Sequence, residues 1–195
     1  MVVTGQTPLE NSLVQQAKNE FRQYEGKVEF NYLVGFPIDE LNNRLQELPQ
    51  NTAIFYLGMI SDKAGRVYSS TEVLEQLIPS SSAPIYAASE IQMGLGIVGG
   101  RLIDFNAMGT RAAEIGLRIL RGESPQNIPV EVIPNTTMLD WRQLRRWGIS
   151  ENRLPSGSVV RFREPTFWEQ YKWRVVGVIS LVILETVLIV FLLIH

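Results

Sequence analysis

The stretch from Val175 to Ile194 constrains the fold of this chain more than any other, because its long apolar run contains only one charged side chain, Glu185. A helix over these positions, rising about 1.5 Å per residue, reaches about 30 Å, the hydrocarbon thickness of a bilayer. The residues just before it, 167–174, mix aromatic and basic side chains of the kind that lie at headgroup level. The sequence therefore predicts one C-terminal transmembrane helix over residues 175–194, with the lipid bilayer as a partner.

Glu185 lies near the middle of the predicted span. A central acidic residue costs around 3 kcal/mol on insertion scales, an amount that the surrounding Leu, Ile and Val residues can outweigh. Two interpretations stay open. Glu185 either makes a hydrogen-bonding contact with a partner helix, as in a homodimer formed through the membrane helix, or is a tolerated residue in a simple anchor.

The composition excludes several kinds of site. The chain has 195 residues, no cysteine and a single histidine, which is its last residue. Disulfides, thiol nucleophiles, Ser-His-Asp triads and histidine-based metal sites are thereby excluded. The formal net charge of −2 gives no electrostatic reason to expect nucleic acid as a partner. We therefore expect no cofactor, no metal site and no enzyme activity in this chain.

Short apolar runs alternate with helical patterns from the first residue to about residue 120, which is typical of a parallel sheet with crossover helices. Thr7 and Glu10 form a predicted capping box with Pro8 at the first helical position, and Ser69 and Glu72 form a second one. The fold class is therefore α/β. The expected strands are residues 1–4, 28–33, 52–57, 85–88 and 99–105, and the expected last helix of this region is 107–121.

Three glycines at 94, 96 and 99 match the G-x-G-x-x-G fingerprint of dinucleotide-binding proteins. That fingerprint requires a strand immediately before it and a helix that starts at it. Here the following residues, GRLIDF, have the pattern of a strand. We interpret these glycines as positions where the backbone bends and packs closely, and we do not expect a dinucleotide.

Ligands of open parallel sheets bind beyond the carboxyl ends of the strands. The loops at that edge offer hydroxyl, amide and carboxylate groups beside apolar ones, which suits a small polar ligand. Loop capping remains the alternative role for each residue. The predicted ligand-binding residues are Gln6, Thr7, Phe36, Ser61, Asp62, Ser89 and Glu90.

The character of the sequence changes from Ile128 onward. Asp140 is predicted to cap a short helix over residues 141–147, which Gly148 ends. Arginines crowd residues 142–163, with acidic residues interspersed. They are interpreted either as contacts with anionic lipid headgroups or a partner, or as a solvated face.

The motifs DWRQLRRWGI and RLPSGSVVRFREP, followed by WEQY just before the apolar stretch, resemble the extracytoplasmic sensor region of bacterial membrane sensor histidine kinases. In that family the region is similar to ABC-transporter substrate-binding proteins. The resemblance implies the C-terminal half of a type 1 periplasmic-binding fold, in which two α/β lobes close on a ligand. The implied domains are a periplasmic-binding-like lobe over 1–136, a membrane-proximal segment over 137–174 and the transmembrane helix over 175–194.

The resemblance further implies that a first lobe and an export signal precede Met1 and that a kinase core follows His195. The expected location is then the inner membrane, with a single pass and the folded part on the periplasmic side. The basic residues before the span alone would favour the cytoplasmic side, by the positive-inside rule. A basic segment after the span, which the family carries, would resolve this conflict.

The leading functional prediction is therefore a non-catalytic, membrane-anchored region of a two-component sensor, which binds a small polar ligand. One alternative is a solute-binding component of an ABC transporter tethered by its tail. The other is a degenerate gene fragment without an independent function.

Overall fold

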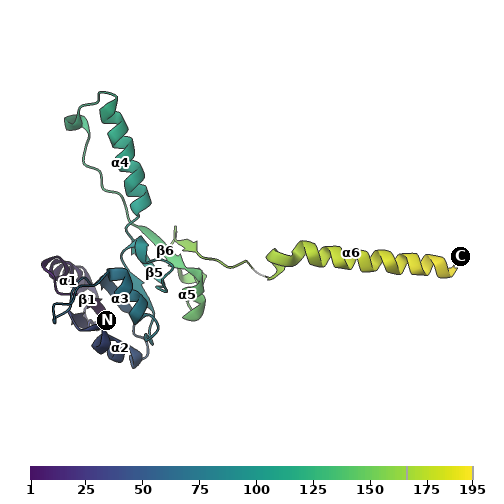
Figure 1. The fold of residues 1–195 in the computed structure, drawn as a ribbon, viewed down its shortest axis with the longest axis horizontal. Coiled ribbons are helices and arrows are strands. Elements are labelled where there is room, and N and C mark those ends of the chain that lie inside the picture. The colour runs from purple at the N-terminus through teal and green to yellow at the C-terminus, as the bar shows by residue number, and fades with distance from the viewer. Residues whose placement is uncertain (166, 195) are drawn as a thin grey trace. The chain divides into compact units, whose positions relative to one another are not determined.

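The computed structural model describes residues 1–165 and 167–194 of the chain (Figure 1). It contains two compact units, of which the first runs from Met1 to Phe162 and the second begins at Arg163. The first unit holds the whole sheet and all the predicted ligand-binding residues.

The first unit is built on a seven-stranded sheet with the order β2-β1-β3-β4-β5-β6-β7. Neighbouring strands are parallel except β5 and β6, which pair antiparallel. The predicted α/β class with a mostly parallel sheet is confirmed. The strands are β1 (Val2–Thr4), β2 (Tyr32–Val34), β3 (Ile54–Gly58), β4 (Ile85–Ala87), β5 (Gly99–Leu102), β6 (Thr136–Asp140) and β7 (Val159–Arg161).

Helices connect these strands, as the alternating pattern predicts. The α-helices of the first unit are α1 (Pro8–Phe21), α2 (Ile38–Gln46), α3 (Ser70–Leu77), α4 (Phe105–Leu120) and α5 (Trp141–Arg146). Short 3-10 helices are η1 (Arg22–Tyr24), η2 (Glu90–Gln92), η3 (Pro125–Asn127) and η4 (Glu151–Arg153).

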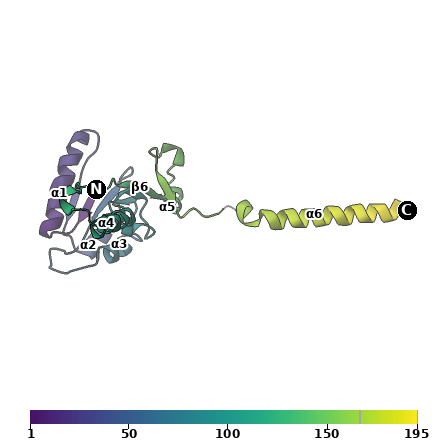
Figure 2. The same cartoon turned by 90° about the horizontal axis from the view of Figure 1, so that it is seen from above.

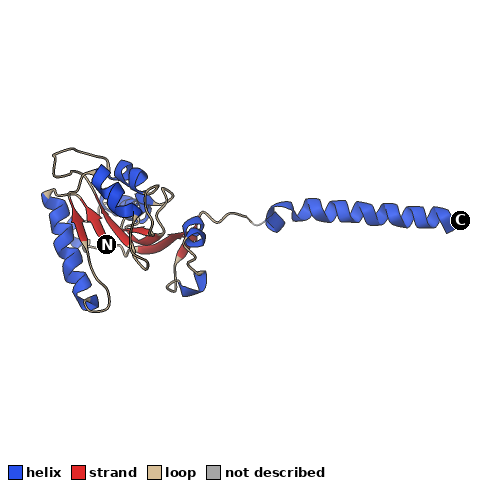
Figure 3. Ribbon diagram, turned by 90° about the horizontal axis from the view of Figure 1, so that it is seen from below, coloured by secondary structure: helices blue, strands red, loops and turns tan. Residues whose placement is uncertain are grey.

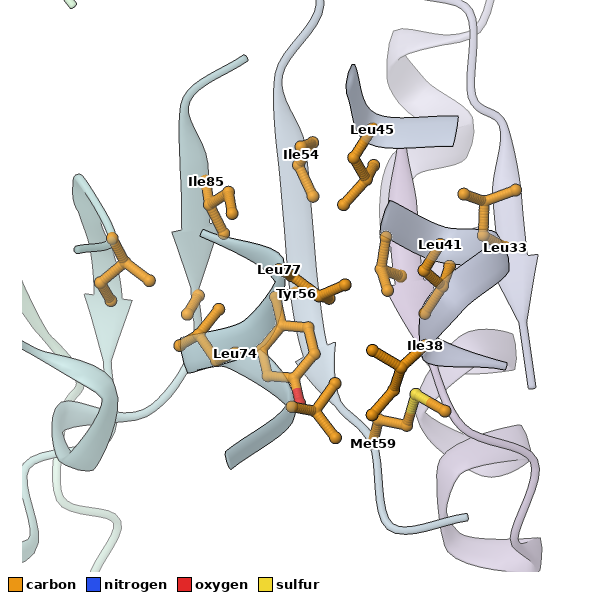
Figure 4. Packing of buried hydrophobic residues seen from close by; sticks show 14 of the residues in the cluster. Leu33, Ile38, Leu41, Leu45, Ile54, Tyr56, Met59, Leu74, Leu77 and Ile85 are labelled. Carbon is orange, nitrogen blue, oxygen red and sulfur yellow. The ribbon is translucent and has the colours of Figure 1, made fainter. Parts of the chain in front are cut away.

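The main core lies between the sheet and helices α2 and α3 (Figure 4). Tyr56 of β3 is almost fully buried there, and burial raises its pKa to about 12. Its hydroxyl donates to the Ser70 carbonyl at 2.7 Å, which satisfies the one polar group that the ring buries. The labelled residues of this core in Figure 4 are Leu33, Ile38, Leu41, Leu45, Ile54, Tyr56, Met59, Leu74, Leu77 and Ile85.

Helix α1 lies on the opposite face of the sheet (Figure 2 and Figure 3). Phe21 at its end contacts the ring of Phe55, which points away from the main core because neighbouring strand residues alternate between the two faces. Helix α5 packs with Leu144 against Val98 and Leu139 in a second, smaller cluster. Both faces of the sheet are therefore covered in part, as a parallel sheet requires.

Both helix starts that were predicted from capping boxes are confirmed, but only one of the two capping boxes forms. The Thr7 hydroxyl accepts from the Glu10 amide at 3.3 Å, and the Glu10 carboxylate accepts from the Thr7 amide at 2.8 Å. At α3 the predicted capping box is wrong, because the Ser69 side chain makes no cap hydrogen bond. Its hydroxyl instead pairs with that of Thr71 at 2.9 Å.

Two strand boundaries also differ from the prediction. Strand β2 begins only at Tyr32, and Val28 is exposed. Strand β5 ends at Leu102, because the Asp104 carboxylate accepts from the Ala107 amide at 2.9 Å and starts α4 earlier than expected. The cap at Asp104 outweighs the β pattern that extends to Phe105.

The glycines before β5 have the conformations that the sequence predicts. Gly94, Gly96 and Gly99 all have positive φ angles, and a strand rather than a helix follows them. A Cβ atom on Gly99 would collide with the carbonyl of Met138 on the neighbouring strand. Close packing of the backbone therefore explains this glycine without a nucleotide.

The predicted boundary between residues 136 and 137 falls inside β6. The residues expected to form a membrane-proximal segment instead supply β6, α5 and β7, and the first unit continues to Phe162. Asp140 does cap α5, since its carboxylate accepts from the Arg142 amide at 2.9 Å. The pairing of β6 with β5 and β7 determines this extension.

The second unit contains one helix, α6 (Phe167–Ile194), which includes the apolar stretch 175–194. The side chains at 187, 188 and 191–194 lie outside the described residues. Within the part of the chain that is described, no helix is long and apolar enough to cross a membrane. The transmembrane helix is not confirmed and stays a prediction.

Candidate functional site

The loops that follow β1, β2, β3 and β4 meet at one edge of the sheet, which we call the carboxyl edge. It comprises residues 5–7, 35–37, 59–69 and 88–93. Backbone hydrogen bonds join the first three loops. The backbone amide of Gln6 donates to the Ser61 carbonyl at 3.2 Å, and the backbone amide of Lys63 donates to the Gly35 carbonyl at 2.8 Å. For the first three loops, the prediction that these segments come together is thus confirmed by their hydrogen bonding.

Glu10 is buried at this edge and joins two of its loops. One carboxylate oxygen accepts from the Thr7 amide at 2.8 Å, and the other accepts from the Ile60 amide at 2.5 Å. A Cβ atom on Gly5 would occupy the space of this carboxylate. Glycine at position 5 therefore makes room for the carboxylate, which fixes the loop after β3 against the start of α1.

Asp62 is fully buried, and its carboxylate is engaged by its own loop. One oxygen accepts from the amides of Ala64 and Arg66 at 2.9 Å each, and the other accepts from the Tyr68 hydroxyl at 2.8 Å. Burial raises the pKa of Asp62, but the backbone and hydroxyl donors outweigh that effect and hold the pKa below its usual value. The sequence predicts Asp62 as a ligand-facing residue, whereas the structure places its carboxylate inside the loop.

Gln6, Thr7 and Phe36 lie beside that loop. The Gln6 side-chain amide donates to the Asp62 carbonyl at 3.1 Å, and Thr7 is used as the cap of α1. The Phe36 ring is partly buried and has the Lys63 ammonium 4.2 Å and the Arg44 guanidinium 4.6 Å from its centre. Gln6 is exposed, so among these three its side chain is the most accessible to a ligand.

Several buried polar atoms at or next to the carboxyl edge have no hydrogen-bond partner among the described residues. They are the Thr4 hydroxyl at the end of β1, the Ser89 hydroxyl after β4 and the Gln92 side-chain carbonyl in η2. Unpaired buried polar atoms are rare in folded proteins, and each costs free energy until it is paired. Ser89 was predicted as a ligand-binding residue. Thr4 and Gln92 were not, because a strand end and a short 3-10 turn carry no distinctive sequence signal.

Glu90, the last predicted residue, forms an ion pair with Arg161 at the end of β7, at 2.7 Å. The Glu90 side chain is only 11% exposed, so the pair is partly shielded from water. Phe162, which follows Arg161, has a φ angle of 56°. The Arg142 guanidinium lies 4.5 Å from the centre of the Phe162 ring. The loop after β4 is therefore connected to the last residues of the first unit, an interaction that no sequence pattern indicated.

Apolar side chains are also exposed at or near the carboxyl edge. Ile60, Val67 and Ile91 are 41%, 76% and 64% exposed, although each lies beside a buried part of the loops. Single exposed apolar residues are ordinary, but several at one edge suit a surface that another part of a protein covers.

A cavity of about 730 Å³ lies at the other end of the strands. Its lining includes Met1, Phe21, Phe55 and Tyr86, none of which was predicted to bind a ligand. Within the described residues no cluster of three or more His, Asp or Glu side chains could hold a metal ion. The chemistry that the carboxyl edge offers is hydrogen bonding and apolar contact.

The fold is similar to that of substrate-binding proteins. An ABC domain in complex with L-Trp from Streptococcus pneumonia matches with a TM-score of 0.55 and 17% identity over 82% of this chain and 54% of that one. An open, ligand-free substrate-binding protein with adhesive properties from Clostridium difficile matches with a TM-score of 0.56 and 17% identity over 84% of this chain and 54% of that one.

A conserved domain protein from Vibrio cholerae matches with a TM-score of 0.52 and 14% identity, over 82% of this chain and 53% of that one. The chain thus spans about half the length of each of these structures. No protein-family model and no curated protein matches the sequence. At these identities the likeness shows a periplasmic-binding-like fold.

Proposed function

We propose that this chain is the membrane-anchored ligand-sensing region of a bacterial two-component sensor histidine kinase. It lies in the inner membrane with its folded part on the periplasmic side, and it binds a small polar molecule without catalysing a reaction. The observation that carries the proposal is the carboxyl edge, where buried polar atoms lack partners among the described residues, on a fold similar to that of substrate-binding proteins.

An amino acid is the first ligand class to test. One similar structure holds L-Trp, and the carboxyl edge combines hydroxyl and amide groups with exposed isoleucines, which suits a ligand with a polar end and an apolar side chain. In this proposal the chain holds the ligand on its carboxyl edge, and a second lobe closes over the bound ligand. The match over only 54% of that structure is consistent with such a lobe.

The Glu90–Arg161 pair supports a route for the signal. Loops of one lobe change their contacts when a two-lobed protein closes on its ligand. A change at the loop after β4 would act on Arg161 and Phe162, the residues directly before the second unit. In this proposal the apolar stretch 175–194 is a transmembrane helix that pairs with a second copy in a homodimer and transmits the change.

A tethered solute-binding component of an ABC transporter is the second candidate, favoured by the description of one similar structure as a substrate-binding protein. Deletion of the gene distinguishes the two. A transporter component is required for uptake of its ligand, whereas a sensor is required for a transcriptional response to it.

The binding proposal is tested by isothermal titration calorimetry on the purified full chain in detergent, with L-tryptophan, other amino acids, sugars and aromatic acids as probes. We expect at least one amino acid to bind, and the double variant Gln6→Ala with Ser89→Ala to bind it at least tenfold more weakly. Ser12→Ala with Gln15→Ala on the exposed side of α1 is the matched control and should leave the affinity unchanged.

Two results would contradict the proposal. If no probe binds the chain, the carboxyl edge is not a ligand site for these compounds, and a fragment without an independent function becomes the better description. If both double variants weaken binding equally, the ligand lies elsewhere on the first unit.

A further inference from the structure

Lys63 carries an exposed positive charge at the carboxyl edge, in the loop after β3. Its backbone amide donates to the Gly35 carbonyl at 2.8 Å, which fixes the residue beside the loop after β2. Its ammonium nitrogen lies 4.2 Å from the centre of the Phe36 ring. The ring attracts and positions the ammonium, but it supplies no negative charge. Among the described residues Lys63 forms no ion pair.

The acidic residues at this edge are all engaged within the chain. The Glu10 and Asp62 carboxylates are buried, and each accepts from two backbone amides. Glu90 pairs with Arg161 at 2.7 Å. In the part of the chain that the structure describes, none of these acids pairs with Lys63, whose charge is therefore still to be matched.

Arg66, the other basic residue of the edge, acts within its own loop. Burial raises the pKa of Asp62, whereas the backbone and hydroxyl donors and the Arg66 charge lower it, and the lowering prevails. The charge of Arg66 thus acts on a carboxylate of the chain. That of Lys63 lies over an aromatic ring instead.

Gln6 brings a hydrogen-bond donor to the same place. Its side chain lies against Gly35, where an added Cβ would come within 3.0 Å of it. The Gln6 amide nitrogen donates one hydrogen to the Asp62 carbonyl at 3.1 Å. A carboxamide nitrogen carries two hydrogens, so the second is available to a ligand. Because Gly35 precedes Phe36 and accepts from Lys63, the amide, the ring and the ammonium form one cluster from three loops.

We propose that the carboxyl edge binds a ligand with a carboxylate, which accepts from the Lys63 ammonium and from the second N–H of Gln6. This inference rests on the proposed function and names the chemical class of its ligand. Hydrogen bonds between an ammonium and a carboxylate are roughly twice as strong as those between neutral groups. The edge therefore selects carboxylic acids, amino acids included, over sugars. The exposed Ile60 and Val67 of the same loop offer apolar contact to the rest of such an acid.

The test is isothermal titration calorimetry of the full chain in detergent, with pairs of probes that differ only in their carboxyl group. The acids are phenylpropionate, isocaproate, L-tryptophan and L-leucine, each paired with its own carboxamide, and D-glucose is the neutral polar probe. A carboxamide keeps the size of the acid but lacks its negative charge, so the ratio of the two affinities measures recognition of that charge. We expect at least one acid to bind, at least tenfold more tightly than its amide.

Three variants locate the preference on Lys63. Lys63→Met should reduce it to less than twofold and leave the affinity for the neutral amide unchanged, which also shows that the variant is folded. Lys63→Arg keeps the charge and should retain the preference. Lys18→Met is the matched control, because Lys18 is likewise exposed and lies over an aromatic ring, that of Tyr32 at 5.1 Å, but belongs to α1. It should leave every affinity unchanged.

Several results would overturn the inference while the proposed function stands. They are amides that bind as tightly as their acids, a preference for acids that survives Lys63→Met, an equal loss of preference in Lys18→Met, and binding of D-glucose alone. If none of the probes binds, the proposed function itself is contradicted, and the assignment of a carboxylate ligand falls with it.

Discussion

Glu10 and Asp62 lie at the same edge of the sheet, and each uses its carboxylate to hold backbone amides. From the sequence alone, Glu10 resembles any surface residue of a helix cap, and Asp62 resembles any residue of a polar loop. Burial and the number of donors separate them from such residues, and neither property can be read from local sequence. The ligand-facing residues are therefore better sought among those whose buried polar atoms have no partner in the part of the chain that the structure describes, namely Thr4, Ser89 and Gln92.

Gly5→Ala should destabilise the first unit. The new Cβ would displace the Glu10 carboxylate and leave the Ile60 amide without its acceptor, and an unsatisfied buried group of this kind costs about 1–3 kcal/mol. Urea unfolding of the chain measures the change. Gly109→Ala in α4, where nothing lies within contact distance, is the control and should be neutral or slightly stabilising, so equal losses in both variants would contradict this role of Gly5.

Asp62 should contribute to the acid sensitivity of the fold. Its pKa in the folded state is below the ordinary value of 3.8, so its stabilising effect is complete above about pH 4 and is lost as the pH falls through the lower, folded-state pKa. Unfolding free energies measured from pH 6 to pH 2 should therefore fall less steeply for Asp62→Asn than for the unmodified chain. Parallel curves would show that the loop does not hold the ionised carboxylate.

The elements of the first unit divide into those that the sequence predicts and those that it does not. Strands β1, β3 and β4 and helices α1, α2 and α3 follow from apolar periodicity, because each buries a regular face against its neighbours. β6 and β7 were missed, since they join the sheet through pairing with distant residues rather than through a local pattern. The exposure of the apolar side of α4 likewise could not be predicted, because periodicity shows which side of a helix is apolar but not whether anything covers it.

The connection between η2 and β7 should be measurable as coupling between Glu90 and Arg161. A double-mutant cycle with Glu90→Gln and Arg161→Gln should give a coupling free energy of about 1 kcal/mol, near the upper end for pairs that are partly exposed. Glu40 and Arg44, which are both nearly half exposed in α2, form the control pair, for which we expect only a few tenths of a kcal/mol. A coupling no larger than that of the control would remove this pair from the proposed signal route.

At the scale of the whole molecule, the fold agrees with the fold that the sequence resemblance implies. The resemblance names sensor regions similar to substrate-binding proteins, and the fold is similar to solved substrate-binding proteins at identities of 14–17%. The chain spans about half the length of each of these structures. Its position in a membrane and its attachment to a kinase remain part of the proposal.

The most direct test of this account is hydrogen–deuterium exchange of the full chain with and without the amino acid that binds best in calorimetry. The account predicts slower exchange in residues 5–7, 35–37, 59–69 and 88–93, which form the carboxyl edge. Protection confined to residues 27–31 and 49–55, which line the cavity at the opposite end of the strands, would contradict it and move the ligand site to that cavity.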